Sequence, residues 1–245
     1  MRNITLSIQY DGTNYKGWQR LGDSDKTIQG KLENVLTKMT NEEIEIIGSG
    51  RTDAGVHALN QVANFKTNSA ITLKEILEYT AHYLPEDIVV KSAVEASENF
   101  HSRYNAKRKI YLYRICNNLQ HNVFERKYVY HITEPLDRTA MKEAASILVG
   151  QHDFRSFTSL KSKKKSTVRE IYSIDIIDNK DEMQIIYDGN GFLHNMVRII
   201  TGTLIEIGKD KLKVSELRNI LNSKDRSCAG YTAPPKGLFL KDVLY

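Results

Sequence analysis

The sequence predicts an α+β protein made of two ferredoxin-like halves, each with the element order β-α-β-β-α-β, that share a mostly antiparallel sheet. Segments in which apolar and polar residues alternate, the pattern of a half-buried strand, are interleaved with segments of helical apolar spacing. This order of segments occurs twice, although the sequence itself does not repeat. A chain of 245 residues is long enough for two modest domains. We place their boundary near Asn105, which gives halves 1–105 and 106–245.

The first half begins with a strand over 4–10, where apolar and polar residues alternate. A helix is predicted over 28–39, because apolar residues recur there at helical spacing after Thr27, a residue type that caps helix N-termini. Three more strands are predicted in this half: one at 44–47, one that ends at 61–65 and one that begins at 88–90. A second helix is predicted to begin with a capping box at Thr72 and to stop before Pro85.

The second half shows the same alternation of patterns. Its first strand is followed, after a long connection, by a helix that ends at Gly150. A later helix is strongly apolar and has Gly208 in the C-cap position. The full order is a strand, a helix, two strands, two helices and a strand, predicted at 108–116, 137–149, 168–177, 183–187, 193–207, 214–221 and 238–243.

The charge balance points modestly to a polyanionic partner. The chain has 35 Lys and Arg against 30 Asp and Glu, a net charge of +5, and it has 13 tyrosines. Aromatic rings stack on unpaired bases, so this composition favours nucleic acid. A mildly basic enzyme whose tyrosines pack in the core explains the same numbers.

The sequence gives no sign of a metal site, a disulfide or export. Cys116 and Cys228 are far apart and match no metal-ligand spacing, and the histidines form no H-E-x-x-H motif. The N-terminus lacks an apolar signal region, and no apolar run approaches the roughly 18 residues of a membrane span. We therefore expect a cytoplasmic protein without metal and with no membrane partner.

The most informative segment is a glycine loop at 48–57, which directly follows a β-like run. Residues two apart in an extended backbone point the same way, so Arg51 and Asp53 can face one cleft, where the guanidinium keeps the carboxylate ionised. A turn with a surface ion pair is the simpler alternative. A phosphate cradle is excluded, because no Lys-Ser or Lys-Thr follows Gly55 and the next segment is β-like.

Five motifs in order make the sequence resemble a known family. They are Asp11-Gly12-Thr13 with Gly17-Trp18-Gln19, the loop Gly50 to His57, Lys109-Ile110-Tyr111-Leu112-Tyr113, Phe192 to Arg198, and Gly237-Leu238-Phe239-Leu240. Together they resemble the tRNA pseudouridine synthase A family, from about Ile4 to Val243.

The resemblance implies a pseudouridine synthase fold with a central RNA-binding cleft between the two halves. It also implies a homodimer that isomerises uridines at positions 38–40 of the tRNA anticodon arm. The N1–C1′ bond of uridine breaks and the uracil rejoins through C5, so no cofactor and no metal is expected. Two alternatives stay open: the same chemistry at a different RNA site, or a non-catalytic tRNA-binding or folding factor.

The resemblance also implies roles for individual residues. Asp53 corresponds to the catalytic carboxylate, by a covalent adduct or by elimination to a glycal. Arg51 corresponds to the residue that helps extrude the target base. Tyr111 corresponds to the active-site tyrosine, Arg198 to an arginine paired with the catalytic Asp, and Leu238 to an apolar residue near the uracil.

Other polar residues have weaker assignments. Tyr113 shares the direction of Tyr111 by strand period and is interpreted as structural. His194 is as well explained by a structural role as by RNA contact, and Asp11 and Trp18 are expected to shape the N-terminal loop. A run of lysines, either a solvated loop or a set of phosphate contacts, comprises Lys161, Lys163, Lys164 and Lys165.

Overall fold

The computed structural model describes residues 1–22, 24–160, 166–179 and 182–245. The chain folds into two compact units, Met1–Lys107 with Phe239–Tyr245, and Arg108–Leu238. Each unit combines helices with a mostly antiparallel sheet, so the predicted α+β class is confirmed. Among the described residues, every helix is too short or too polar to cross a membrane. The lysines predicted to meet phosphates, Lys161, Lys163, Lys164 and Lys165, lie outside the described residues.

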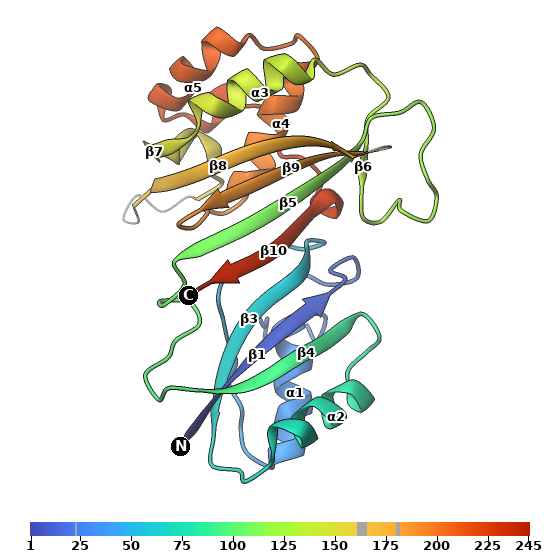
Figure 1. The fold of residues 1–245 in the computed structure, drawn as a ribbon, viewed down its shortest axis with the longest axis vertical. Helices are drawn as coiled ribbons and strands as arrows, with labels where there is room; N and C mark the ends of the chain where they lie inside the picture. The colour runs from blue at the N-terminus through green and yellow to red at the C-terminus, as the bar shows by residue number, and fades with distance from the viewer. Residues whose placement is uncertain (23, 161–165, 180–181) are drawn as a thin grey trace. The chain divides into compact units, whose positions relative to one another are not determined.

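The first unit has the predicted order β-α-β-β-α-β (Figure 1). Its sheet runs β4-β1-β3-β10, with β2 paired to β3. β1 is antiparallel to both of its neighbours, and β10 is parallel to β3, with Phe239 opposite His57. The elements are β1 (Arg2–Tyr10), α1 (Ile28–Thr40), β2 (Ile47–Gly48), β3 (His57–Thr67), α2 (Leu73–Tyr83), β4 (Ile88–Ala96) and β10 (Leu238–Leu244).

The core of this unit lies between the sheet and its helices. Alternate side chains of β1 are fully buried and so are three apolar positions of α1, whereas Val35 and Met39 of the same helix are partly exposed. The fully buried side chains comprise Ile4, Leu6 and Ile8 on the strand and Ile28, Leu32 and Leu36 on the helix. The Thr27 side chain accepts a hydrogen bond from Gly30 N, the N-cap contact expected at the start of α1.

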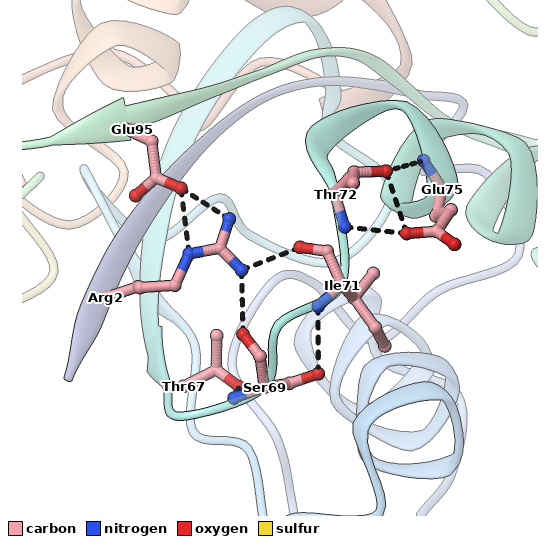
Figure 2. A network of polar contacts seen from close by, with 7 residues as sticks. All are labelled: Arg2, Thr67, Ser69, Ile71, Thr72, Glu75 and Glu95. Carbon is pink, nitrogen blue, oxygen red and sulfur yellow. Dashed lines mark hydrogen bonds and ion pairs between the residues drawn. The ribbon is translucent and has the colours of Figure 1, made fainter.

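The start of α2 is held by a polar network shown in Figure 2. Arg2 donates through Nε to Glu95 Oε1 at 2.9 Å and through one terminal nitrogen to the carbonyls of Ser69 and Ile71, at 2.7 and 2.6 Å. Thr72 and Glu75 form the predicted capping box. The chain ends of β1 and β4 are therefore tied to the loop that leads into α2.

The second unit has a sheet in the order β5-β9-β8-β7, with β6 parallel to β5. Three helices cover one face of it (Figure 1). Its strands are β5 (Arg108–Cys116), β6 (Tyr130–His131), β7 (Gly150–Asp153), β8 (Val168–Asn179) and β9 (Glu182–Gly189). Its helices are α3 (Arg138–Ile147), α4 (Met196–Gly208) and α5 (Leu217–Ser223), with short 3₁₀ turns at Phe154–Phe157, Val214–Glu216, Arg226–Cys228 and Pro235–Gly237.

The structure differs from the sequence-based elements in several places. The strand predicted at 44–47 is found at Ile47–Gly48, and β6 was not predicted. Residues 239–245, predicted to belong to the second half, pack with the first unit because β10 pairs with β3. β7 was not predicted, since Gly150 was interpreted only as the end of a helix; it takes φ +105° and turns the chain directly into a strand. The apolar helix begins at Met196 rather than 193, because Asn195 is left-handed at φ 61°.

Candidate active site

The glycine loop lies between β2 and β3 and is packed against the segment that follows β1. Gly48 lies under the indole of Trp18, where an added Cβ would approach the ring atoms to 2.6–2.7 Å. Gly17 has φ +102°, and a Cβ there would lie 2.6 Å from Thr52 O. Both positions therefore require glycine. The N-terminal loop and the glycine loop approach more closely than side chains at these positions would allow.

Backbone hydrogen bonds fix the residues around Asp53. Trp18 N donates to Thr52 O at 3.0 Å, and Gly55 N donates to Tyr15 O at 3.3 Å. Val56 N closes a turn on Asp53 O at 3.1 Å. The peptide group before Asp53 and the one between Ala54 and Gly55 are thus anchored to the N-terminal loop, and the Asp53 carbonyl is held within the turn, so the backbone that carries the carboxylate is fixed at three points.

Buried hydroxyl groups add a second set of anchors. The Tyr10 hydroxyl lies 2.8 Å from Thr52 Oγ1, and burial raises the pKa of Tyr10, so this hydroxyl stays protonated. The Tyr15 hydroxyl donates to Asp87 Oδ1 at 2.5 Å. Burial and this contact with the carboxylate both raise the pKa of Tyr15.

Side-chain exposure alternates over residues 51–53, as in an extended backbone. Thr52 is buried, while Arg51 is exposed and Asp53 is partly exposed. The guanidinium and the carboxylate are therefore both accessible from outside the first unit. A fixed, accessible carboxylate can act as a nucleophile or as a base toward a bound substrate.

His57, which has no role assigned from the sequence, connects three parts of the first unit. Its side chain is 1% exposed. Nδ1 accepts a hydrogen bond from Gly12 N at 3.1 Å and lies 3.1 Å from Asp11 Oδ1. The ring stacks on Phe239 of β10, with centroids 4.7 Å apart. In the sequence, the position of His57 where the glycine loop meets an apolar strand is the feature that could have indicated this role.

Tyr111 lies on β5 in the second unit, opposite Tyr187 of β9. Its side chain is 9% exposed and meets Phe192 edge-on, with centroids 5.2 Å apart. Tyr113 is fully buried and donates from its hydroxyl to Pro234 O at 2.7 Å, and burial raises its pKa well above the ordinary value. Tyr113 therefore packs in the core, and its hydroxyl is occupied by a backbone carbonyl.

Arg198 projects from the first turn of α4. Its Nε donates to Ala233 O at 2.7 Å, and a terminal nitrogen donates to Asn195 Oδ1 at 2.8 Å. Ala233 N returns a bond to Arg198 O at 3.0 Å. The guanidinium is partly exposed and held in one orientation by these contacts.

The remaining predicted residues of the second unit differ in exposure. Leu238 is 5% exposed at the start of β10 and follows the 3₁₀ turn Pro235–Gly237. The His194 side chain is exposed, while its carbonyl accepts from Ser159 N and Thr158 Oγ1. The structure thus places Arg51 and Asp53 in the first unit, and Tyr111, Arg198 and Leu238 in the second.

Comparison with known proteins gives a consistent result over the whole chain. The family model described as "tRNA pseudouridine synthase" matches residues 6–105 and 144–245. "tRNA pseudouridine synthase A 1" of Clostridium tetani is 53% identical over 245 residues, which cover 100% of both chains. "tRNA pseudouridine synthase A 2" of Bacillus cereus is 50% identical over 243 residues, which cover 99% of both chains.

A solved structure, "Crystal Structure of a Cbf5-Nop10-Gar1 Complex", is more distant. It aligns with a TM-score of 0.34 and 12% identity over 82% of this chain and 45% of that chain. The family match and the identities of 50% or more over nearly the full length are much stronger evidence of relationship. By these matches, the chain belongs to the tRNA pseudouridine synthase family.

Proposed function

We propose that this protein isomerises uridine to pseudouridine at positions 38–40 of the tRNA anticodon arm, with Asp53 as the catalytic carboxylate. The observation that carries the proposal is the accessible carboxylate on a loop anchored at Thr52 and Gly55. Family membership supplies the reaction class. A rigid carboxylate suits a reaction in which one group must stay positioned while the base leaves and returns.

The reaction rearranges bonds without changing the composition of the nucleotide. The N1–C1′ bond breaks, the uracil turns, a C5–C1′ bond forms, N1 gains a proton and C5 loses one. Asp53 acts on the ribose or the base, by a covalent adduct or by elimination to a glycal. A second group must take the C5 proton, and we assign that role to the Tyr111 hydroxyl. No cofactor or metal takes part in this scheme.

The other site residues have supporting roles in the proposal. Arg51, exposed beside Asp53, helps to extrude the target base from the stem. Arg198 pairs with Asp53 and orients its carboxylate. Leu238 packs beside the uracil. Family membership is the basis of these three roles. The fixed orientation of the Arg198 guanidinium supports its role as a partner of Asp53.

The proposal extends to partners and location. The substrate is tRNA, gripped at the anticodon arm by a cytoplasmic homodimer. The lysine run contributes phosphate contacts, because clustered cations release counterions from an RNA backbone. It comprises Lys161, Lys163, Lys164 and Lys165.

Pseudouridine mapping in a strain that lacks this protein tests the proposal. Loss of pseudouridine at positions 38–40 of tRNA, restored by the wild-type gene, is the expected result. Loss of pseudouridine at another RNA position instead would show that the protein carries out the same reaction on a different substrate. An unchanged pattern would favour a non-catalytic tRNA-binding or folding factor, although such a factor has no need of an accessible, anchored Asp53.

A further inference from the structure

The second unit contains a pocket of about 1020 Å³ at the base of the long loop between β5 and β6. Figure 1 shows this loop extending from the end of β5. The polar side chains that line the pocket are rich in amides and imidazoles: Asn118, Gln120, Asn122, His121 and His131. Groups of these two kinds both donate and accept hydrogen bonds.

The pocket and the side chain of Tyr111 lie on different faces of β5. Successive side chains of a strand point to opposite faces of the sheet. Tyr111 and Tyr113 share the face on which Tyr113 is buried, whereas Arg114, which lines the pocket, points to the other face. The pocket therefore lies on the opposite side of β5 from Tyr111.

Ion pairs hold the floor of the pocket in place. Arg114 forms salt bridges with Glu182 at 2.8 Å and with Glu125 at 2.9 Å. Arg126 donates to a neutral group, the Val123 carbonyl, at 2.6 Å, and Lys236 also lines the pocket. Three cations thus accompany two carboxylates, so the pocket is weakly positive and suits a ligand with one phosphate and many hydrogen-bonding groups.

Apolar side chains on the same loop are unusually exposed. Phe124 is 83% exposed and Leu119, which lines the pocket, is 80% exposed. Within the pocket, the rings of His121 and His131 lie with centroids 5.0 Å apart. Rings beside amides and cations are the combination that binds an unpaired nucleotide, by stacking on the base, bonding to its edge and contacting its phosphate.

We propose that this pocket binds an unpaired nucleotide of the tRNA, outside the uridine that is isomerised. The base stacks on the histidine rings that line the pocket or on Phe124, which is exposed on the same loop. The amides bond to its edge, and Arg126 with Lys236 contacts the phosphate. The inference rests on the proposed function only in requiring an RNA substrate. A protein partner fits less well, because amides, imidazoles and cations outnumber the apolar side chains Leu119 and Val129 in the lining of the pocket.

Binding and turnover of a tRNA transcript test the inference separately. The variant Phe124→Ala with Arg126→Gln should bind the transcript at least about fivefold more weakly, the lower end of the effect of one stacked base. Its single-turnover rate at saturating tRNA should stay unchanged. Matched controls at sites remote from the loop, Tyr83→Ala on α2 and Lys142→Gln on α3, should change neither quantity.

Cross-linking shows where on the protein the transcript lies. A transcript carrying 4-thiouridine should cross-link wild-type protein within residues 117–131, and the double variant should lose that cross-link. Unchanged affinity with no cross-link in this segment would overturn the inference, as would a loss of self-association with unchanged tRNA affinity. Failure of the proposed function would instead appear as wild-type protein without turnover, whatever the cross-links show.

Discussion

The Tyr10 hydroxyl lies 2.8 Å from Oγ1 of Thr52, the residue immediately before Asp53. Strand β1 thereby contacts the glycine loop through a buried hydrogen bond. The second unit contains a matching pair, Tyr187 with Thr201, also at 2.8 Å and also buried. The two pairs allow stability and catalysis to be separated.

Tyr10→Phe should destabilise the fold by about 1–3 kcal/mol, because it removes the hydroxyl partner of the buried Thr52 side chain. Tyr187→Phe should cost less, about 0.5–1.5 kcal/mol, because the Thr201 hydroxyl still donates to Val197 O at 2.8 Å. Only Tyr10→Phe should also lower the saturated turnover rate, since Thr52 positions Asp53. Thermal melts and single-turnover assays on both variants provide the measurement. Equal rates in the two variants would show that the Tyr10 contact does not position the loop.

Asp53→Asn should keep the fold and tRNA binding but abolish turnover. Asn is nearly isosteric with Asp, yet it cannot act as a nucleophile or a base. Tritium release from tRNA labelled at C5 of uridine is the assay, with tRNA affinity and melting temperature as controls. Near-wild-type release would remove the catalytic assignment of Asp53 and favour a binding protein.

Tyr111→Phe should lower turnover by about 10²-fold or more if the hydroxyl takes the C5 proton, the usual effect of a positioned acid or base. Affinity should barely change, because the ring and its contact with Phe192 remain. Tyr111→Ala should additionally destabilise the fold by about 3–5 kcal/mol, as for other large buried rings. A Phe variant with full rate would leave Tyr111 at most a stacking platform.

Neutralising the lysine run, Lys161, Lys163, Lys164 and Lys165, should weaken tRNA binding and spare saturated turnover. A plot of the logarithm of the tRNA-binding constant against the logarithm of the salt concentration should become less steep. Its slope should shrink in magnitude by roughly 0.7 to 0.9 for every phosphate that a lysine no longer neutralises. Titrations at several salt concentrations measure this slope. If both affinity and slope are unchanged, the run is a solvated loop.

Thr72→Ala should cost about 1 kcal/mol of stability, because it removes the side chain that accepts from Glu75 N at the start of α2. Thr72→Ser retains the hydroxyl and should restore most of the loss. Denaturant unfolding of the two variants measures the difference. Equal destabilisation by Ala and Ser would assign the effect to the missing methyl group instead of the cap.

Local patterns predicted much of the fold because apolar periodicity and capping residues are properties of each segment by itself. The strand at 4–10, the helix after Thr27 and the capping box at Thr72 all appear in the structure. The partner of the C-terminal strand was not predictable, since pairing between β10 and β3 joins residues about 180 positions apart. Sequence periodicity carries no information on such a partner.

The site shows the same division. Strand alternation predicted only that Arg51 and Asp53 can face one cleft; the structure has Arg51 exposed, Thr52 buried and Asp53 partly exposed. The anchoring of the loop was not predicted, because it depends on tertiary contacts such as Trp18 over Gly48 and Phe239 on His57. A histidine role of this kind appears only once the distant strand is in place.

The pairing of β10 with β3 has a consequence for the order of events during synthesis. Residues 1–107 leave the ribosome first, but their sheet lacks its β10 strand, and His57 lacks its stacked Phe239, until residues 239–245 emerge. The whole second unit is translated in between. The end of the glycine loop at His57 therefore acquires its last contact only after translation has passed residue 239, whereas the hydrogen bonds around Asp53 can form within residues 1–107 alone.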